Sequence, residues 1–581
     1  MGNWVKDMTL KEALAVNRSG GKVGDAAIYH LICGFQPLHL ATFFRAHLYQ
    51  LVAGDHPVEI QCGVYGNTCG NIESAARSGA IGSAIALEWT DLDPRLGLRS
   101  SGGWSSATKP DILANCVRSF AQLTTAIEKL AARMPVALCP PNLPLPPIGH
   151  TIGVQSSSFE LELELQLAEF LLRLSTLPGV CVVQRSHIES TGPCLDARME
   201  LVAGFPYTLP FASALAGALA KLLCPPMPKK GLITDLDDTL WSGLVGEVGA
   251  EGVSWSQESH TQAHGLYQQM LGHLAECGVL LGVCSKNEMA PVEASLARKD
   301  LFFNAQSLFP VCANWGPKSN SVAQVLKTWN IAADAVVFVD DNLMELEEVR
   351  QAHPGITCLQ FSGKNPAAVW ELLGELRDLF GKPALMAEDQ LRQSSIRTSA
   401  QLRDSTEDVA SPEFLSTLQG AVTLEWGADV ADKRPLELVN KTNQFNLNGL
   451  RIGDADWRRQ LEQENTVVVV GSYQDKFGPL GKIAVLVGSR DGAKVRVSHW
   501  VLSCRAFSRR IEHHMVDSLF RQFDAAEIEF SFATTERNQP LQEFFRSMSI
   551  APDAAGTCRI SRSGFLAHCG VLPHNVSSVR K

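Results

Sequence analysis

The first third of the chain alternates short apolar runs with longer segments in which apolar residues recur every three or four positions. The runs AIYHLI, VEIQCGVYG and CVVQRSH predict strands, and residues 112–134 and 159–177 predict helices. Strands that alternate with helices are typical of a parallel sheet covered by helices. We therefore expect an α/β fold for this part of the chain.

Two polar segments interrupt this pattern and predict domain boundaries. The string CPPMPKKG, at 224–231, precedes a new apolar run, and the stretch 387–412 carries many charges and few large apolar residues. Clusters of proline and of charge are typical of linkers. At roughly 100 to 200 residues per domain, the chain is long enough for several cores. The pattern predicts three domains, at 1–225, 228–385 and 413–581.

The middle part opens with an apolar run that ends in acidic residues. GLIT predicts a buried strand, and Asp235, Asp237 and Thr239 follow it in the pattern D-x-D-x-T. A residue at the carboxyl end of a strand faces the crevice in which α/β sheets bind ligands. Two carboxylates this close together repel each other unless a cation lies between them, and Mg²⁺ is the expected ion. One carboxylate would then attack phosphorus, and the other would transfer the proton of the leaving group.

Three more polar sites follow at the ends of predicted elements, and the four together resemble the motifs of the haloacid dehalogenase (HAD) superfamily. VCSKN ends a strand at Ser285, NWGPKS supplies Lys318, and FVDDN ends a strand at Asp340 and Asp341. Taken alone, D-x-D-x-T is as typical of a polar turn as of a catalytic site, and a lone lysine is typically solvated. Four motifs in this order indicate a HAD domain with a Rossmann-like sheet.

The resemblance implies a role for each of these residues. Asp235 would take the phosphoryl group, and Asp237 would act first as an acid and then as a base. Ser285 would hydrogen-bond the phosphoryl group, and Lys318 would neutralise the nucleophile and the incoming phosphate. The implied Mg²⁺ ligands are Asp235, Asp340, Asp341 and the backbone carbonyl of Asp237, and the implied substrate contacts within these motifs are Thr239 and Asn287.

The intervals between the motifs bear on the size of the substrate. Neither the segment from Asp235 to Ser285 nor the segment from Ser285 to Lys318 has room for a large cap domain beyond the core helices. An uncapped site does not shut out water by itself, but it admits a bulky partner. We expect an open, capless active site.

Beyond these motifs the chain resembles the FkbH-like subfamily of HAD proteins. The match runs through DLDDTLWSGLVGEVG, at 235–249, and reaches the third part at LVNKTNQFNLNGLR, at 438–451. The second string fits an asparagine-rich turn before a strand, and as a functional site it would form a polar rim for the substrate. The residues of that rim are Lys441, Thr442, Asn443 and Asn446.

The subfamily resemblance implies a function. Its members are taken to draw a glyceryl group from 1,3-bisphosphoglycerate, remove phosphate, and load the acyl unit on the phosphopantetheine thiol of an acyl carrier protein in polyketide-type biosynthesis. An acyl phosphate is already activated and needs a thiolate and a stabilised oxyanion, whereas a phosphate ester needs the aspartate and Mg²⁺. The alternatives are a plain Mg²⁺-dependent phosphatase and a carrier-protein-binding module without catalysis.

A covalent glyceryl thioester on the enzyme would need a reactive cysteine. Cys284 stands next to Ser285, and Lys286 or Lys318 would lower the pKa of its thiol. Neighbours on a strand point to opposite faces, so Cys284 is buried if Ser285 faces the site. Both alternatives stay open, with Cys504 as a second candidate.

The third part resembles the Gcn5-related acyltransferase (GNAT) fold, an α+β fold. TVVVVGSY, GKIAVLVG, AKVRVSHWVLSC and AEIEFSF predict strands, with a helix at 511–523 before the last of them. GNAT folds hold a pyrophosphate on backbone amides where a glycine-rich turn opens the helix. Here the turn RAFSRR, at 505–510, lacks glycine, which speaks against coenzyme A binding in that manner. Arg505 either meets the phosphate of a carrier's phosphopantetheine or belongs to a solvated basic turn.

The SGNH hydrolases have a rhythm of strands similar to that of the first part. Their serine in a G-D-S turn is absent here, because Gly34 is followed by Phe35, and no terminal D-x-x-H is evident. If the domain has this fold, we expect a docking or positioning role rather than hydrolysis.

Composition limits the classes of binding partner and the cellular compartment that we expect for the protein. The 581 residues carry a formal net charge of −10 without long runs of one sign, which argues against nucleic acid as a partner. No stretch reaches the roughly 20 apolar residues of a membrane span, and the first residues lack the pattern of a secretory signal. The 15 cysteines show no C-x-x-C pair, which is typical of a reducing compartment. We expect a cytoplasmic enzyme.

Overall fold

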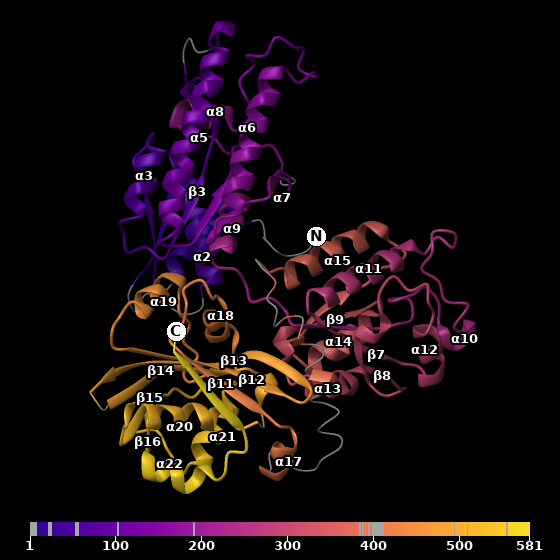
Figure 1. Cartoon of the computed structure of the whole chain (residues 1–581). Helices are drawn as coiled ribbons and strands as arrows, with labels where there is room; N and C mark the ends of the chain where they lie inside the picture. The colour runs from indigo at the N-terminus through magenta and orange to yellow at the C-terminus, as the bar shows by residue number, and fades with distance from the viewer. Residues whose placement is uncertain are drawn as a thin grey trace. The chain divides into compact units, whose positions relative to one another are not determined.

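The computed structural model describes residues 8–20, 26–52, 57–100, 104–189, 192–382, 385, 389, 391–392, 396–397, 412–492, 494–507, 509–553 and 556–580. The chain forms two compact units, one of Asn3–Pro226 with Gly453–Ala455 and one of Met227–Ile452 with Asp456–Lys581. The described residues contain three sheets, of five, five and seven strands (Figure 1). The predicted linker at 387–412 lies for the most part outside these residues, and the division into three domains stays a prediction.

The sheet of the first unit has five strands, and all neighbouring strands are parallel, as the alternation of strands and helices predicts. Their order is β2-β1-β3-β4-β5, so the chain forms β2 on one side of β1 and then crosses to form β3 on the other. The strands are β1 (Ala27–Cys33), β2 (Val58–Cys62), β3 (Gly82–Ala86), β4 (Val136–Cys139) and β5 (Val180–Val182).

Helices cover both faces of this sheet. Successive residues of a strand point to opposite faces, and in β1 Leu31 joins the core formed with α1, α2 and α9, whereas Ile32 joins the core formed with α3, α5 and α6. Burial on both faces explains why the strands are almost continuously apolar. The helices are α1 (Leu10–Ser19), α2 (Leu38–Leu51), α3 (Thr68–Ala75), α4 (Trp89–Leu92), α5 (Lys109–Ala131), α6 (Ser158–Ser175), α7 (Arg185–Glu189), α8 (Ala197–Ala203) and α9 (Leu209–Leu223).

Two details of this unit differ from or refine the sequence expectations. The run CVVQRSH is a strand only at its start, because β5 ends at Val182 and α7 begins at Arg185. The most apolar helix, α9, is buried along its centre from Phe211 to Ala220. Among the described residues, no helix combines the length and the apolarity needed to cross a membrane.

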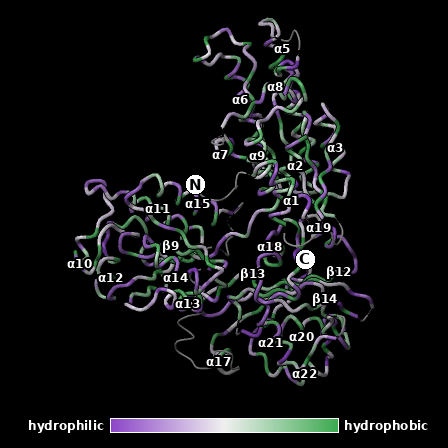
Figure 2. Tube along the Cα trace, turned by 180° about the vertical axis from the view of Figure 1, so that it is seen from behind, coloured by the Kyte–Doolittle hydropathy of each residue, from purple (hydrophilic) through white to green (hydrophobic). Residues whose placement is uncertain are grey.

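The second sheet has the order β10-β9-β6-β7-β8, and its neighbouring strands are again parallel. The strand β9 is buried at all five of its residues, and Figure 2 shows mainly hydrophobic positions around it. The strands are β6 (Gly231–Thr234), β7 (Leu280–Ser285), β8 (Leu308–Ala313), β9 (Val336–Asp340) and β10 (Thr357–Gln360).

Helices also cover both faces of the second sheet. On one face Ile233 belongs to a core cluster that includes residues of α13 and α14. On the other face Tyr267 of α11 donates a hydrogen bond from its hydroxyl to Thr234 at 3.0 Å. The helices are α10 (Val245–Val248), α11 (Gln262–Glu276), α12 (Met289–Leu296), α13 (Lys318–Trp329), α14 (Leu343–Ala352) and α15 (Pro366–Phe380). This parallel α/β arrangement is the predicted fold class.

The third sheet has the order β16-β15-β14-β13-β12-β11-β17 and is antiparallel except for the pairs β14–β15 and β11–β17. The predicted helix at 511–523 coincides with α20 (Ile511–Phe523). The GNAT resemblance itself stays a prediction. The strands are β11 (Ala421–Trp426), β12 (Thr466–Asp475), β13 (Gly478–Asp491), β14 (Lys494–Leu502), β15 (Glu527–Ser531), β16 (Thr557–Ser561) and β17 (Asn575–Arg580), and the other helices are α17 (Pro412–Thr417), α18 (Arg434–Lys441), α19 (Asp454–Leu461), α21 (Gln539–Ser547) and α22 (Arg562–Cys569).

Candidate active site

Three predicted site residues lie at the carboxyl ends of three adjacent strands. Asp235 directly follows the central strand β6, Ser285 ends β7 on one side of it, and Asp340 ends β9 on the other. The backbone N–H of Asp235 donates to the carbonyl of Val339 at 2.9 Å, which fixes the first aspartate beside the second strand end. The edge where parallel strands end is the usual ligand site of such sheets.

A buried lysine joins two of these carboxylates. Lys318 is the first residue of α13, and its Nζ lies 2.6 Å from Oδ2 of Asp340 and 3.0 Å from Oδ2 of Asp235. Burial disfavours the charged lysine, but the attraction of Asp235 and Asp340 outweighs burial and raises the pKa of Lys318. The ammonium group therefore stays charged and holds the two strand ends together.

Three carboxylates at this edge form a candidate metal centre. Asp235, Asp340 and Asp341 each offer an oxygen, and these oxygens lie within 4.8 Å of one another. Burial first, and then the charge of Asp235, raise the pKa of Asp340 to about 7, and burial also raises the pKa of Asp235 and of Asp341. One ammonium group is too little positive charge for three such acids.

An unpaired oxygen supports the same conclusion. Oδ1 of Asp235 is buried and has no hydrogen-bond partner among the described residues. A buried carboxylate oxygen without a donor is energetically costly. Clustered carboxylate oxygens are the ligands that hard divalent cations such as Mg²⁺ prefer. The residues therefore fit a divalent cation, as the sequence predicts.

The second aspartate of D-x-D-x-T has a separate set of contacts. Oδ1 of Asp237 accepts hydrogen bonds from Nε1 of Trp241 at 2.9 Å and from the backbone N–H of Val245 at 3.1 Å. Its Oδ2 accepts from Nδ2 of Asn287 at 3.1 Å, and the same Nδ2 lies 3.1 Å from Oγ of Ser285. Asn287 thus links the carboxyl group of Asp237 to the hydroxyl group of Ser285.

Thr239 contacts the backbone of one of the three carboxylate residues of the candidate metal centre. Its side chain is fully buried, and its Oγ1 accepts a hydrogen bond from the backbone N–H of Asp341 at 3.0 Å. The contact orients Asp341 toward the two other carboxylates. Thr239 therefore has a positioning role in this structure, whereas the sequence reasoning counted it among the substrate contacts.

Cys284 points away from the carboxylates. Its thiol is fully buried in the core cluster that contains Cys312, Val322 and Val325. Burial, and then the neighbouring Cys312, raise the pKa of the Cys284 thiol well above its usual value. The structure thus has the arrangement in which Ser285 faces the site and Cys284 lies beneath it, so Cys284 is not brought together with the other candidates.

We expect Cys284→Ala to leave the rate of phosphate release within about threefold of the wild type, because the thiol lies on the opposite face of β7. The lost packing should lower the free energy of unfolding by about 1–2 kcal/mol. Steady-state kinetics and urea denaturation measure the two effects. A loss of more than about 100-fold in kcat with an intact fold would restore Cys284 as a covalent nucleophile.

The predicted rim of the third part forms a hydrogen-bonded turn. Oδ1 of Asn446 accepts from the backbone N–H of Asn448 at 3.2 Å and of Gly449 at 2.8 Å, and its Nδ2 donates to the carbonyl of Thr442 at 2.9 Å. Lys441, the last residue of α18, pairs with Glu437 of the same helix, and Asn443 in the turn pairs with Arg451. Among the described residues, no hydrogen bond or ion pair joins these side chains to the carboxylates of the metal centre.

Arg505 also lies within local structure. It belongs to the short helix η5 (Cys504–Ala506), is 7% exposed, and has its Nε 3.4 Å from Oγ of Ser503. Its carbonyl accepts a hydrogen bond from Nη1 of Arg509 at 2.9 Å. The structure therefore places Arg505 inside its turn, and Cys504 beside it is half-buried.

The fold has a counterpart among solved structures. The chain is similar to the N-terminal part of the protein BF1531 from Bacteroides fragilis, which contains a phosphatase domain and was determined in complex with Mg. The two chains are 19% identical, the TM-score is 0.53, and the match covers 65% of this chain and 99% of the other. No family model matches the sequence, and no curated protein matches it. The likeness shows a common fold.

Sequence reasoning missed one contact of the site. Trp241 donates its indole N–H to Asp237, and its side chain is fully buried. The two residues are four apart in the sequence, and they meet because the chain turns back between them. The left-handed φ of +52° at Asp238 makes that turn.

Proposed function

We propose that the protein is a Mg²⁺-dependent phosphatase or phosphotransferase that works through a phosphoaspartate on Asp235. The observation that carries this proposal is the buried cluster in which Lys318 bridges Asp235 and Asp340 beside Asp341. The phosphatase domain of BF1531, a protein of the same fold, was determined with Mg. Mg²⁺ bound by the three carboxylates would neutralise the phosphoryl oxygens.

Each protein residue then has a defined task. A carboxylate oxygen of Asp235 attacks phosphorus, the bond from phosphorus to the ester oxygen breaks, and that oxygen takes a proton from Asp237. Asp237 next removes a proton from water, the water oxygen attacks phosphorus, and Asp235 leaves. The three hydrogen bonds to Asp237 keep its carboxyl group in place for both transfers. Lys318 neutralises Asp235 between cycles.

We further propose that the substrate is a phosphorylated three-carbon acyl donor, such as 1,3-bisphosphoglycerate, and that the acyl group passes to the phosphopantetheine thiol of an acyl carrier protein. The motif strings at 235–249 and 438–451 support this, as they resemble the FkbH-like subfamily. Between β6 and β7 the described chain has α10 and α11 as its only α-helices, and between β7 and β8 it has only α12, so neither described interval contains a cap domain.

Two exposed apolar side chains that lie close in sequence to residues of the site support a protein partner. Trp315, three residues before Lys318, is 70% exposed, and Met344, three residues after Asp341, is 82% exposed. Exposed apolar side chains that gather around a functional site are typical of protein interaction surfaces. A carrier protein that presents its arm would cover them.

The deciding experiment is intact-mass measurement of a phosphopantetheinylated carrier protein after incubation with the enzyme, Mg²⁺ and 1,3-bisphosphoglycerate. The proposal expects a mass gain of one glyceryl group together with release of phosphate. Release of phosphate without a mass gain would reduce the function to that of a plain phosphatase. If neither occurs, a binding module without catalysis would be the correct interpretation.

A further inference from the structure

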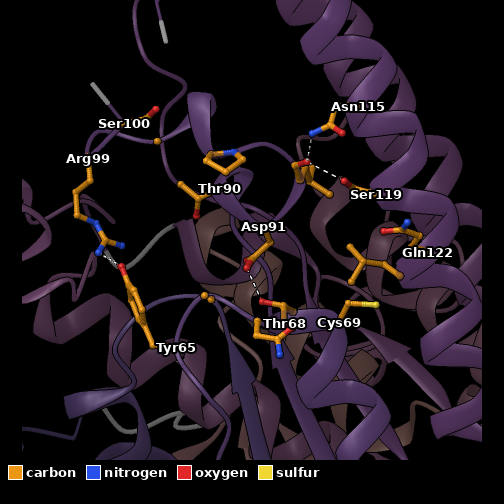
Figure 3. A pocket seen from close by; sticks show the side chains of 17 residues that line it. Tyr65, Thr68, Cys69, Thr90, Asp91, Arg99, Ser100, Asn115, Ser119 and Gln122 are labelled. Atoms are coloured by element: carbon orange, nitrogen blue, oxygen red, sulfur yellow. Dashed lines mark hydrogen bonds between the residues drawn. The ribbon is translucent and has the colours of Figure 1, made fainter. Parts of the chain in front are cut away.

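The unit Asn3–Pro226 contains a concave site of its own, and none of the residues that line it is a carboxylate of the proposed phosphatase. A cavity of about 540 Å³ opens at the carboxyl ends of β1 and β3, a volume within the roughly 300–1,000 Å³ of small-molecule sites. Its wall comes from Gly34 after β1, the segment 65–69 before and within α3, the segment 90–100 after β3, and one face of α5 (Figure 3). Because β2 and β3 lie on opposite sides of β1, the cavity sits at the point where the strand order reverses, which is the usual ligand site of such sheets.

A carboxylate occupies the base of this cavity. Oδ1 of Asp91 accepts a hydrogen bond from Oγ1 of Thr68 at 2.5 Å, and Oδ2 accepts from the backbone N–H of Glu88 at 2.8 Å. A Cβ at Gly34 would lie 1.9 Å from Oδ1 of Asp91, so only glycine at the end of β1 leaves room for this carboxylate. Burial raises the pKa of Asp91 to about 6, and the hydrogen bonds from Thr68 and Glu88 oppose that shift.

The charges of the wall exclude an anionic ligand. Of the described residues that line the cavity, Asp91 and Arg99 carry a charge at neutral pH. The Nε of Arg99 lies 2.8 Å from Oε1 of Glu200, whose side chain is 5% exposed, and the guanidinium group also contacts Tyr65. The positive charge is therefore already balanced inside the protein, and the negative charge of Asp91 remains. A phosphate or carboxylate would meet repulsion here.

Neutral hydrogen-bonding groups make up much of the rest of the wall. The hydroxyl groups of Thr90 and Ser100 and the side-chain amide of Gln122 have no hydrogen bond among the described residues. Asn67 adds an amide at the rim, and Tyr65, 47% exposed, adds an aromatic surface. In Figure 3 the side chains of Tyr65, Thr90 and Gln122 lie on different sides of Asp91 and Thr68. Many neutral donors and acceptors around one carboxylate suit a ligand with several hydroxyl groups.

We propose that this cavity binds a neutral polyhydroxylated small molecule, of the size of one or two sugar rings. Asp91 accepts hydrogen bonds from ligand hydroxyl groups at the base, and Thr90 and Gln122 bind further hydroxyl groups at the sides. The proposal goes beyond the phosphatase function, since none of its residues belongs to the metal centre.

The test is ligand-observed NMR and calorimetry on the full chain. Saturation transfer is measured from the protein to D-glucose, D-mannose, D-galactose, N-acetyl-D-glucosamine and cellobiose, with D-glycerate as an anionic probe. The expected result is transfer to at least one neutral sugar, and titration calorimetry then gives the affinity for that sugar. No transfer to any neutral probe, or a stronger signal from D-glycerate, would overturn the proposal.

Matched variants tie the binding to the cavity. Thr90→Val removes a hydroxyl group but keeps the methyl group that lies where Gly97 has no side chain, and Gln122→Leu removes an exposed amide. The loss of one hydrogen bond weakens binding about fivefold, so the double variant should bind the sugar at least about tenfold more weakly. Thr125→Val, an exposed position of α5 outside the wall, should bind as the wild type does. Equal affinities of the double variant and the wild type would sink the assignment, and matching circular dichroism spectra and thermal unfolding curves show that the variants are folded.

Discussion

Asp235→Asn is expected to lower kcat for Mg²⁺-dependent hydrolysis of p-nitrophenyl phosphate by at least about 1,000-fold. The amide is a poor nucleophile, so the phosphoaspartate does not form. The substitution also removes one of the three carboxylates that lie within 4.8 Å of one another, so Mg²⁺ should bind more weakly. Steady-state kinetics and titration calorimetry with Mg²⁺ measure the two effects.

Asp238→Asn is the matched control for this variant. Asp238 is exposed and has a left-handed φ of +52°, which asparagine adopts readily. Its Oδ1 accepts from the backbone N–H of Gly243 at 2.9 Å, and an asparagine oxygen can do the same. We expect kcat within about threefold of the wild type. Equal activities of the Asp235→Asn and wild-type proteins would exclude Asp235 as the nucleophile.

Lys318→Met is expected to reduce both stability and activity. The ammonium group lies within 3.0 Å of two buried carboxylates, and its removal leaves both without their cation. Removing one partner of a buried ion pair in this way lowers the free energy of unfolding by about 3–5 kcal/mol. Loss of a charge that stabilises the transferring phosphoryl group should lower kcat by about 100-fold. Urea denaturation in the presence of EDTA measures stability in the absence of metal, and phosphate release measures activity.

Lys327→Met tests whether the effect belongs to the site. Lys327 lies in the last turn of the same helix and is exposed, so its charge contributes little to the free energy of unfolding. We expect the free energy of unfolding to fall by less than about 1 kcal/mol and kcat to stay unchanged. If Lys318→Met unfolds at the same urea concentration as Lys327→Met, the buried bridge contributes nothing to the fold, and the assigned role of Lys318 fails.

Much of the candidate site could be predicted because it depends on short-range rules. Asp235 directly follows one strand, and Ser285 and Asp340 end two others, so these side chains come to one edge as soon as the strands are parallel and adjacent. The alternation of faces along β7 also offered the burial of Cys284 as one of two alternatives. A helix such as α20 matched its predicted range because its apolar spacing and its boundaries are both local features.

The rest depends on contacts between distant parts of the chain. Thr239 was counted as a substrate contact, yet it bonds the backbone of Asp341, about a hundred residues further on. The hydrogen bond between Thr68 and Asp91 exists only because β3 crosses to the far side of β1, and the sequence does not state the order of strands. The turn at Asn446 is likewise held by Asn538, whose Nδ2 donates to its carbonyl at 3.0 Å.

The bridge made by Lys318 has a consequence for the binding of magnesium to the metal-free protein. Acidic residues gathered without any counter-charge would push their strands apart once the ion departs, and proteins built that way lose their shape when stripped by a chelator. Here a permanent positive group supplied by the polypeptide remains between two strand ends. The metal-free enzyme therefore keeps its fold. The concentration of magnesium around it, rather than a refolding step, would then determine when turnover starts.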